Sequence, residues 1–157
     1  MEKTHEFYLS EAIEIARSNL EKGGGPFGAV IVRNGEIISK SGNTVTLDND
    51  PTAHAEINAI REACKILNNF ELKDCILYSS CEPCPMCLGA IYWARLEAVY
   101  FAASREDAED AGFDDSFIYK ELNTPLENRI IPTKQMLRKK AQIPFEEWKV
   151  KEDKIKY

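Results

Sequence analysis

The amino-acid sequence predicts an α/β fold built as one domain over residues 1–157, with helices on both faces of a mixed sheet. Apolar residues recur at helical spacing over residues 6–21, which indicates an amphipathic helix. Short apolar runs at residues 75–80 and 98–103 are typical of buried strands, and a helical pattern separates them. Strands that alternate with helices favour this architecture, and the chain is long enough to enclose a hydrophobic core.

The first half of the chain predicts a helix, a hairpin and a second helix. Three glycines end the first helix. The stretches "FGAVIV" and "EIIS" flank Asn34-Gly35, a pair favoured in two-residue hairpin turns. After a polar loop, Asp50 is expected to cap a helix that has Pro51 in its first turn and continues to about Leu67.

The second half begins with strong patterns and ends with weak ones. The stretches "CILYSS" and "AVYFAA" predict strands, and "CPMCLGAIYWA" between them predicts a largely apolar helix. Beyond Ser104 we expect a short acidic helix, a turn around Phe113 and a helix over residues 116–122. A strand near Arg129–Ile131 and a final short helix that opens at Pro144 complete the expected order.

Composition disfavours several classes of protein. The net charge of -6 argues against a protein whose main ligand is a phosphate backbone. No apolar run approaches the roughly 20 residues that cross a bilayer, and the first residues lack the pattern of a secretory signal. We therefore expect a cytoplasmic protein that does not bind membranes. In that reducing compartment, the five cysteines are better explained by metal binding than by disulfides.

One histidine and two cysteines form the pattern of a metal site. Cys84 and Cys87 lie three residues apart near the start of a predicted helix, so their thiols share one face. With His54 they supply three ligands, whereas a structural zinc site normally has four. We therefore expect one Zn²⁺ per chain with water in the fourth position. Glu56 would take a proton from this water and deliver it to the substrate.

Each half of this pattern also has a structural explanation. An isolated C-x-x-C can be a redox pair or half of a zinc ribbon, and a lone histidine is often a structural residue. Cys81 could supply a fourth ligand, which would make the protein a non-catalytic zinc-binding module with Glu56 as a bystander. The two halves together are more specific than either alone, because H-x-E…P-C-x-x-C is the signature of zinc deaminases.

Longer stretches around these motifs resemble a known family. "HAEINAI" and "CEPCPMCLGAIYWAR" are similar to the cytidine-deaminase-like superfamily, and "GGPFGAVIV", "NDPTAHAE" and "AGFDDSFIYKE" resemble its small bacterial guanine deaminases. This resemblance implies a three-layer α/β/α sandwich with a mixed five-stranded sheet. It implies attack of zinc-activated water on C2 of guanine, giving xanthine and ammonia. It also implies a homodimer whose C-terminal tails, residues 144–157, are exchanged.

By the same resemblance, three residues contact the purine. Phe27 and Trp93 would pack on the flat base, although aromatic residues in such stretches are more often part of a core. Asn43 would pair with the polar edge of the purine, because its amide offers both a donor and an acceptor. By residue type alone, Asn43 is a turn asparagine.

Two acids and a tyrosine complete the expected site. The resemblance makes Asp115 a proton carrier for the departing amine. The adjacent Asp114 could hold this role instead, or both could be solvated turn residues. Tyr157 would close the active site of the partner subunit, whereas the last residues of a chain are by default frayed.

Other substrates fit the same motifs. A tRNA adenosine deaminase has a similar motif region and acts on a flipped base, and the net charge of +4 over residues 133–157 keeps this alternative open. The acidic balance and the aromatic stretch "IYWAR" weigh against it. Deamination of cytosine or guanosine also stays open, because the size of a pocket cannot be read from the sequence. We expect a small purine base as the substrate and no nucleic-acid partner.

Overall fold

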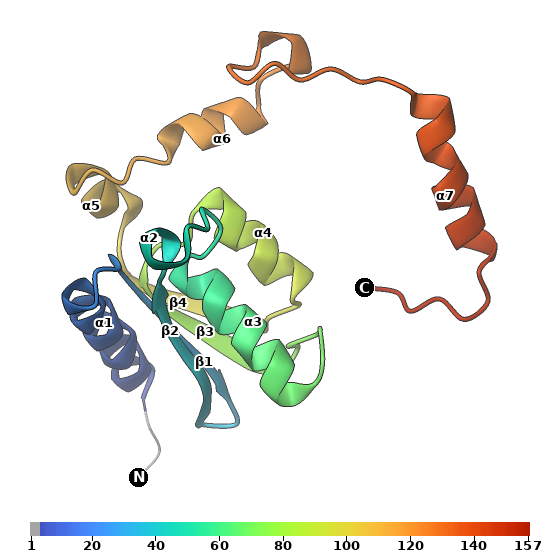
Figure 1. The fold of residues 1–157 in the computed structure, drawn as a ribbon. Helices are drawn as coiled ribbons and strands as arrows, with labels where there is room; N and C mark the ends of the chain where they lie inside the picture. Colours follow the sequence, from blue (N-terminus) through green and yellow to red (C-terminus); the bar gives the residue numbers. More distant parts are fainter. Residues whose placement is uncertain (1–3) are drawn as a thin grey trace. The chain divides into compact units, whose positions relative to one another are not determined.

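A four-stranded mixed sheet lies between helices in the computed structural model of the chain, which describes residues 4–157 (Figure 1). The strands run in the order β2-β1-β3-β4. β1 is antiparallel to β2 and β3, whereas β3 and β4 are parallel. Their bounds are β1 Gly25–Arg33, β2 Glu36–Asn43, β3 Cys75–Cys81 and β4 Ala98–Ala103. The predicted α/β class is confirmed, but residues 4–157 form four strands in this sheet and not the expected five.

The helices follow the predicted order, and the chain divides into two compact units. The first unit contains the sheet and ends at Asp115, and the second comprises residues 116–157. The helices are α1 His5–Glu21, α2 Val45–Asp48, α3 Ala55–Leu67, α4 Pro85–Trp93, α5 Arg105–Asp110, α6 Ser116–Leu122, the 3-10 helix Leu126–Asn128, and α7 Arg138–Val150.

The sheet has a hydrophobic core on each face, because successive residues of a strand point to opposite sides. Ala29 and Ile31 of β1 lie in the core beneath α3 and α4. Val30 and Val32, which alternate with them, lie in the core beneath α1. The first unit is therefore a three-layer arrangement of helix, sheet and helices, as expected (Figure 1).

The start of α3 differs from the sequence prediction. This helix begins at Ala55 and not at Pro51, because Asp50 does not cap it. The Asp50 carboxylate instead accepts hydrogen bonds from the amide (2.8 Å) and the hydroxyl (2.7 Å) of Thr52, which close a local turn. The helix consequently begins directly after His54, which becomes its N-cap residue.

The second unit departs further from the prediction. No strand forms near Arg129–Ile131, where the Ile130 amide donates to a side-chain oxygen of Glu121 at 3.0 Å. The last helix was expected to open at Pro144, since proline favours a first turn. It begins at Arg138 and contains Pro144 in its interior.

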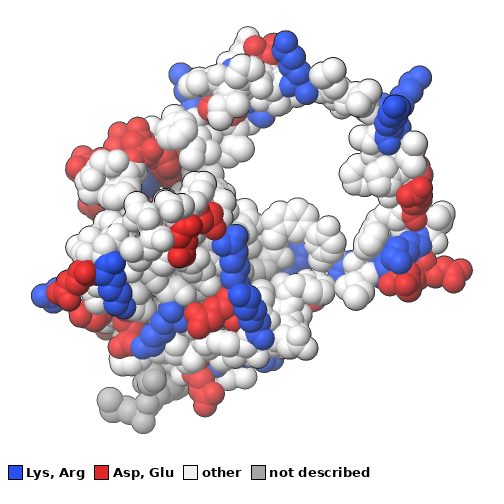
Figure 2. Space-filling model, viewed as in Figure 1, with Lys and Arg blue, Asp and Glu red and all other residues white. Residues whose placement is uncertain are grey.

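Charge is unevenly distributed over the surface of the first unit. Acidic side chains gather over α5, whose sequence is REDAED (Figure 2). Elsewhere on the face in view, lysine and arginine side chains are interspersed with acids. In the described part of the chain, no helix combines the length and apolarity needed to span a membrane.

Candidate active site and metal centre

Three potential metal ligands meet where two helices begin. His54 is the N-cap residue of α3, Cys84 is the N-cap residue of α4, and Cys87 lies in the first turn of α4. His54 Nδ1 is 3.5 Å from the Sγ atoms of both cysteines. The three ligand atoms lie within 4.8 Å of one another, and within residues 4–157 they are the one group of this kind. Tetrahedral zinc with bonds of about 2.0–2.3 Å needs ligands roughly 3.3–3.8 Å apart, so one ion fits here.

Because His54 is an N-cap residue, its side chain and that of Glu56 can face the same point. Inside an ideal helix, residues two apart are rotated by about 200° and do not share a face. His54 has extended backbone angles, φ -68° and ψ 156°, so helical spacing does not constrain it relative to Glu56. Glu56 Oε2 lies 3.4 Å from Cys87 Sγ. The carboxylate and the ligand cluster therefore face the same space.

The thiol pair is arranged to carry negative charge. A hydrogen bond from the Cys87 thiol, assisted by one from His54, lowers the pKa of Cys84 to about 4. The same hydrogen bond, together with burial, raises the pKa of Cys87, so the proton shared by the pair stays on Cys87. The hydrogen bond to Cys84 also raises the pKa of His54. A thiolate, a second thiol and an imidazole are a donor set that zinc prefers, and they fit this metal.

Glu56 is held in a buried position by a residue that the sequence analysis missed. Glu56 is only 6 % exposed, and burial raises the pKa of its carboxyl group. The Ser79 hydroxyl donates a hydrogen bond of 3.1 Å to Glu56 Oε1. A signal for Ser79 exists in the strand pattern, because it occupies the same face of β3 as the core residues Cys75 and Leu77. A hydroxyl at such a position needs a buried partner.

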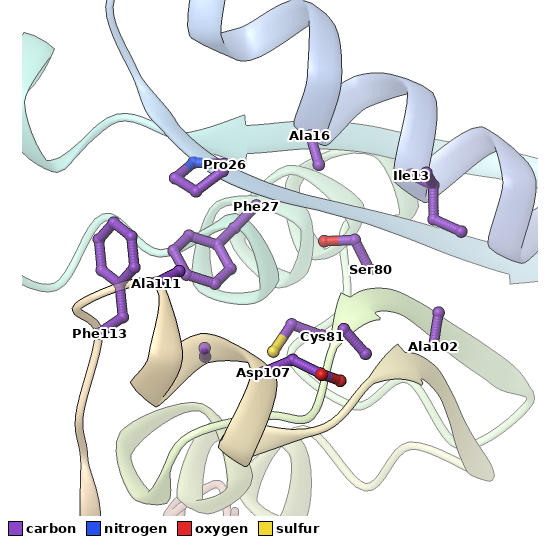
Figure 3. Close-up of a pocket in the computed structure, with 12 residues that line it drawn as sticks. Ile13, Ala16, Pro26, Phe27, Ser80, Cys81, Ala102, Asp107, Ala111 and Phe113 are labelled. Atoms are coloured by element: carbon purple, nitrogen blue, oxygen red, sulfur yellow. The ribbon is translucent and has the colours of Figure 1, made fainter.

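Cys81 lies outside the ligand cluster. Its thiol donates to the Ser104 carbonyl at 3.5 Å, and burial raises its pKa to about 11. It lines a cavity of about 380 Å³ that is walled mainly by apolar side chains (Figure 3). Phe27 lines the same cavity, with its ring packed edge-to-face on Phe113 at a centroid distance of 5.0 Å. The geometry thus favours three protein ligands over four.

Asn43 combines the two roles considered from the sequence. It is the last residue of β2 and is 8 % exposed. Its side-chain oxygen accepts a hydrogen bond from the Val45 amide at 3.2 Å, as in an asparagine turn. Because an amide N–H can only donate, this bond fixes the orientation of the Asn43 amide. Within residues 4–157, its NH₂ group has no hydrogen-bond partner.

The remaining predicted site residues are Asp115, Asp114, Trp93 and Tyr157, and they differ in burial and in position along the chain. Asp115 is half-buried, and burial together with the negative charge of Cys84 raises its pKa, whereas Asp114 is exposed. Trp93 is at the opposite end of α4, six residues or about 9 Å of helix axis beyond Cys87. It is 65 % exposed. Tyr157 belongs to the second unit.

The chain matches the family model for the cytidine and deoxycytidylate deaminase zinc-binding region over residues 2–103. It therefore belongs to this family of zinc-binding deaminases. Over 154 residues it is 56 % identical to the guanine deaminase of Bacillus subtilis, which covers 98 % of this chain and 99 % of that protein. An X-ray structure of the Bacillus subtilis guanine deaminase superimposes with a TM-score of 0.96 at 55 % identity, covering 99 % of both chains.

Other relatives are similar over a smaller part of the chain. A solved structure of the guanine deaminase from Nitrosomonas europaea is 31 % identical, with a TM-score of 0.69, over 73 % of this chain and 66 % of that one. The tRNA-specific adenosine deaminase of Aquifex aeolicus is 50 % identical over 98 residues, which are 62 % of this chain and 65 % of that protein.

Proposed function

We propose that this protein is a zinc-dependent guanine deaminase, which hydrolyses guanine to xanthine and ammonia. The observation that carries the proposal is the extent of its similarity to the Bacillus subtilis guanine deaminase. That similarity covers 98 % of the chain and so includes nearly all of residues 116–157, whereas similarity to the tRNA-specific enzyme covers 62 %. The interspersed charges on the face seen in Figure 2 also suit a small base better than a polyanion.

His54, Cys84 and Cys87 would hold the zinc ion. When bound, zinc supplies a Lewis acid that lowers the pKa of a bound water far below its bulk value, to about 7. Glu56 takes a proton from the water that adds to C2 of guanine and delivers it to the ring nitrogen beside C2. The burial that raises its pKa favours this exchange of protons near neutral pH. The hydroxyl now on C2 gives up its remaining proton, and Asp115 or Glu56 supplies a proton to the amino group; the C–N bond then breaks, ammonia leaves and C2 becomes a carbonyl carbon of xanthine.

Phe27 and Asn43 are the proposed contacts with the base. The side-chain oxygen of Asn43 is occupied by the Val45 amide, so its NH₂ group is the part that remains for substrate. O6 and N7 of guanine are both acceptors, which an NH₂ group can satisfy. Phe27 would pack on the ring. Trp93 lies at the opposite end of α4 from the thiols, where it is exposed.

The first experiment is a substrate comparison with the zinc-loaded protein. Ammonia release is measured from guanine, guanosine, cytosine and adenosine, and inosine formation is measured in a tRNA anticodon stem-loop. We expect turnover of guanine that a chelator abolishes and added zinc restores. Deamination of the tRNA without turnover of guanine would assign the chain to the tRNA enzymes. Stoichiometric zinc without any deamination would favour a structural module.

We further propose a cytoplasmic homodimer in which residues 144–157 close the active site of the partner, with Tyr157 over the base. Large apolar side chains of the second unit support a covering partner, because Ile130, Ile131, Met136 and Val150 are 77–79 % exposed. Exchange of the tail would place such surface against another subunit.

Hybrid dimers test this exchange. Chains that lack the last five residues are refolded together with full-length chains that carry Glu56→Gln. In an exchanged hybrid, the truncated chain keeps Glu56 and receives an intact tail, so activity returns. If each tail covers its own site, no site in the hybrid is complete and activity stays low. Full activity of the truncated protein alone would exclude a closing role for the tail.

A further inference from the structure

We propose that Asn19 is a positioning residue that fixes Asn43 for substrate binding. This inference rests on the proposed function, because the proposed function assigns Asn43 to the purine. Asn19 lies in the last turn of α1, is 5 % exposed, and belongs to neither the metal site nor the cavity wall. It is buried and polar, and one of the residues that it contacts, Asn43, is 24 positions away in the sequence.

The Asn19 amide joins three elements at the edge of the site. Its NH₂ group donates to the carbonyl oxygen of Gly25 at 2.7 Å and to that of Asn43 at 2.8 Å. Gly25 and Asn43 are paired where β1 begins and β2 ends. One side chain of α1 therefore holds both strands at the point where Asn43 leaves the sheet.

Two glycines make room for this amide. A Cβ atom at Gly24 would lie 2.3 Å from Asn19 Nδ2, and a Cβ atom at Gly42 would lie 2.5 Å from Asn19 Oδ1. Neither glycine has a positive φ, so the backbone conformation does not require glycine at these positions. The requirement is space: Asn19 occupies it at Gly42, and Asn19 together with the Asn43 carbonyl oxygen, 2.5 Å away, occupies it at Gly24.

The chain on either side of Asn43 is held from the opposite direction by α3. The NH₂ group of Asn58 donates to the Gly42 carbonyl and to the Thr44 hydroxyl, each at 3.0 Å. The Thr44 amide donates to the Ala53 carbonyl at 2.9 Å. Asn19 is the group that binds the carbonyl of Asn43 itself, so it sets the position from which the Asn43 side chain extends.

This arrangement makes the effect of Asn19 depend on the side chain of Asn43. A displacement of about 1 Å in a group that positions substrate can lower a rate about 100-fold. If Asn19 acts only through Asn43, its loss has no further effect on turnover once the Asn43 side chain is gone. A residue that merely stabilises the fold would not show this dependence.

A double-mutant cycle on the zinc-loaded enzyme tests the dependence. We expect Asn19→Ala to lower kcat/KM for guanine by about 5–150-fold with unchanged zinc content. In the Asn43→Ala background, Asn19→Ala should cause no further loss. Ser39→Ala is the matched control, because it removes another buried side-chain bond to a carbonyl, Ser39 Oγ to Ala59 at 2.8 Å. It should leave kcat/KM close to wild type in both backgrounds.

Gly42→Ala gives a second route if Asn19→Ala does not fold. The added Cβ displaces the Asn19 amide while the residue itself is retained, and it should lower kcat/KM only when Asn43 is present. Effects of Asn19 and Asn43 that multiply in the double variant would overturn the inference, as would loss of zinc or unchanged kinetics in Asn19→Ala. Wild-type protein without guanine turnover would refute the proposed function first, and the inference with it.

Discussion

Replacing Glu56 by glutamine separates proton transfer from the architecture of the site. Glutamine has nearly the same size as glutamate, and its side-chain oxygen can keep the 3.1 Å hydrogen bond from Ser79. The residue is 6 % exposed, so a smaller side chain would leave a cavity. We therefore expect Glu56→Gln to fold and to bind zinc as the wild type does.

The expected loss of activity follows from the two proton transfers assigned to Glu56. A missing general acid–base typically lowers turnover by about 10²–10⁴-fold. Glu56 Oε2 lies 3.4 Å from Cys87 Sγ, and the Ser79 hydroxyl holds the carboxylate at that point. We expect kcat for guanine to fall by at least 100-fold, with a much smaller change in KM.

Although Glu56→Gln should lower activity, it should stabilise the zinc-free protein against unfolding. Burial raises the pKa of Glu56 above its ordinary value of 4.5, so the folded state holds this proton more tightly than the unfolded state. The folded state is therefore destabilised as the pH rises from the unfolded pKa towards the folded pKa. Glutamine has no such dependence. The Tm advantage of zinc-free Glu56→Gln over zinc-free wild type should grow from about pH 4.5 upward.

The assays are steady-state kinetics with guanine, zinc analysis, and thermal unfolding across this pH range. Glu62→Gln is the matched control, because Glu62 is an exposed acid on the same helix whose carboxylate accepts a surface hydrogen bond from Ser41. It should leave both kinetics and the pH dependence unchanged. Near-normal turnover of zinc-replete Glu56→Gln would remove Glu56 from the mechanism.

Three further predictions address the other site residues. Cys81→Ser should keep full zinc content while Cys84→Ser loses it, because the Cys81 thiol bonds to the Ser104 carbonyl; equal zinc loss on metal analysis would contradict the three-ligand site. Asn43→Ala should weaken transition-state binding by about 1–3 kcal/mol, measured as a lower kcat/KM for guanine with zinc retained. Unchanged kinetics would make Asn43 a turn residue only. Asp115→Asn should lower kcat more than Asp114→Asn, because Asp115 is half-buried with a raised pKa whereas Asp114 is exposed; equal losses would speak against this assignment.

The ligand cluster was predictable because its signal is local in the sequence. His54, Cys84 and Cys87 belong to two short motifs whose residue types and spacing are specific to one chemistry. The start of α3 was not predictable in the same way. Asp50 and Pro51 are favourable for a helix start, and only the competing turn formed by Asp50 and Thr52 moves the start to Ala55.

The sequence alone does not reveal side-chain partners that are far apart along the chain. Asn19 bonds to a carbonyl 24 positions away, and Ser79 bonds to a carboxylate 23 positions away. Neither belongs to a motif; the strand pattern marks Ser79 as a buried hydroxyl, but its partner, like that of Asn19, is identified only when packing brings the two together. The choice between Asp114 and Asp115 likewise depends on burial, which two adjacent acids in a turn do not reveal. In the second unit, weak periodicity led to the strand near Arg129–Ile131, which does not form.

The use of two N-cap residues as metal ligands has a consequence for helix ends. Neither His54 nor Cys84 makes a side-chain capping bond, so the first turns of α3 and α4 lack an interaction that typically contributes about 1 kcal/mol. A bound ion would therefore stabilise the first turns of both helices. Metal loss should then first increase the rate of amide hydrogen exchange in residues 55–58 and 86–88, while β3 between the two helices keeps its protection. In such a protein, the integrity of two helix starts reports the occupancy of the active site.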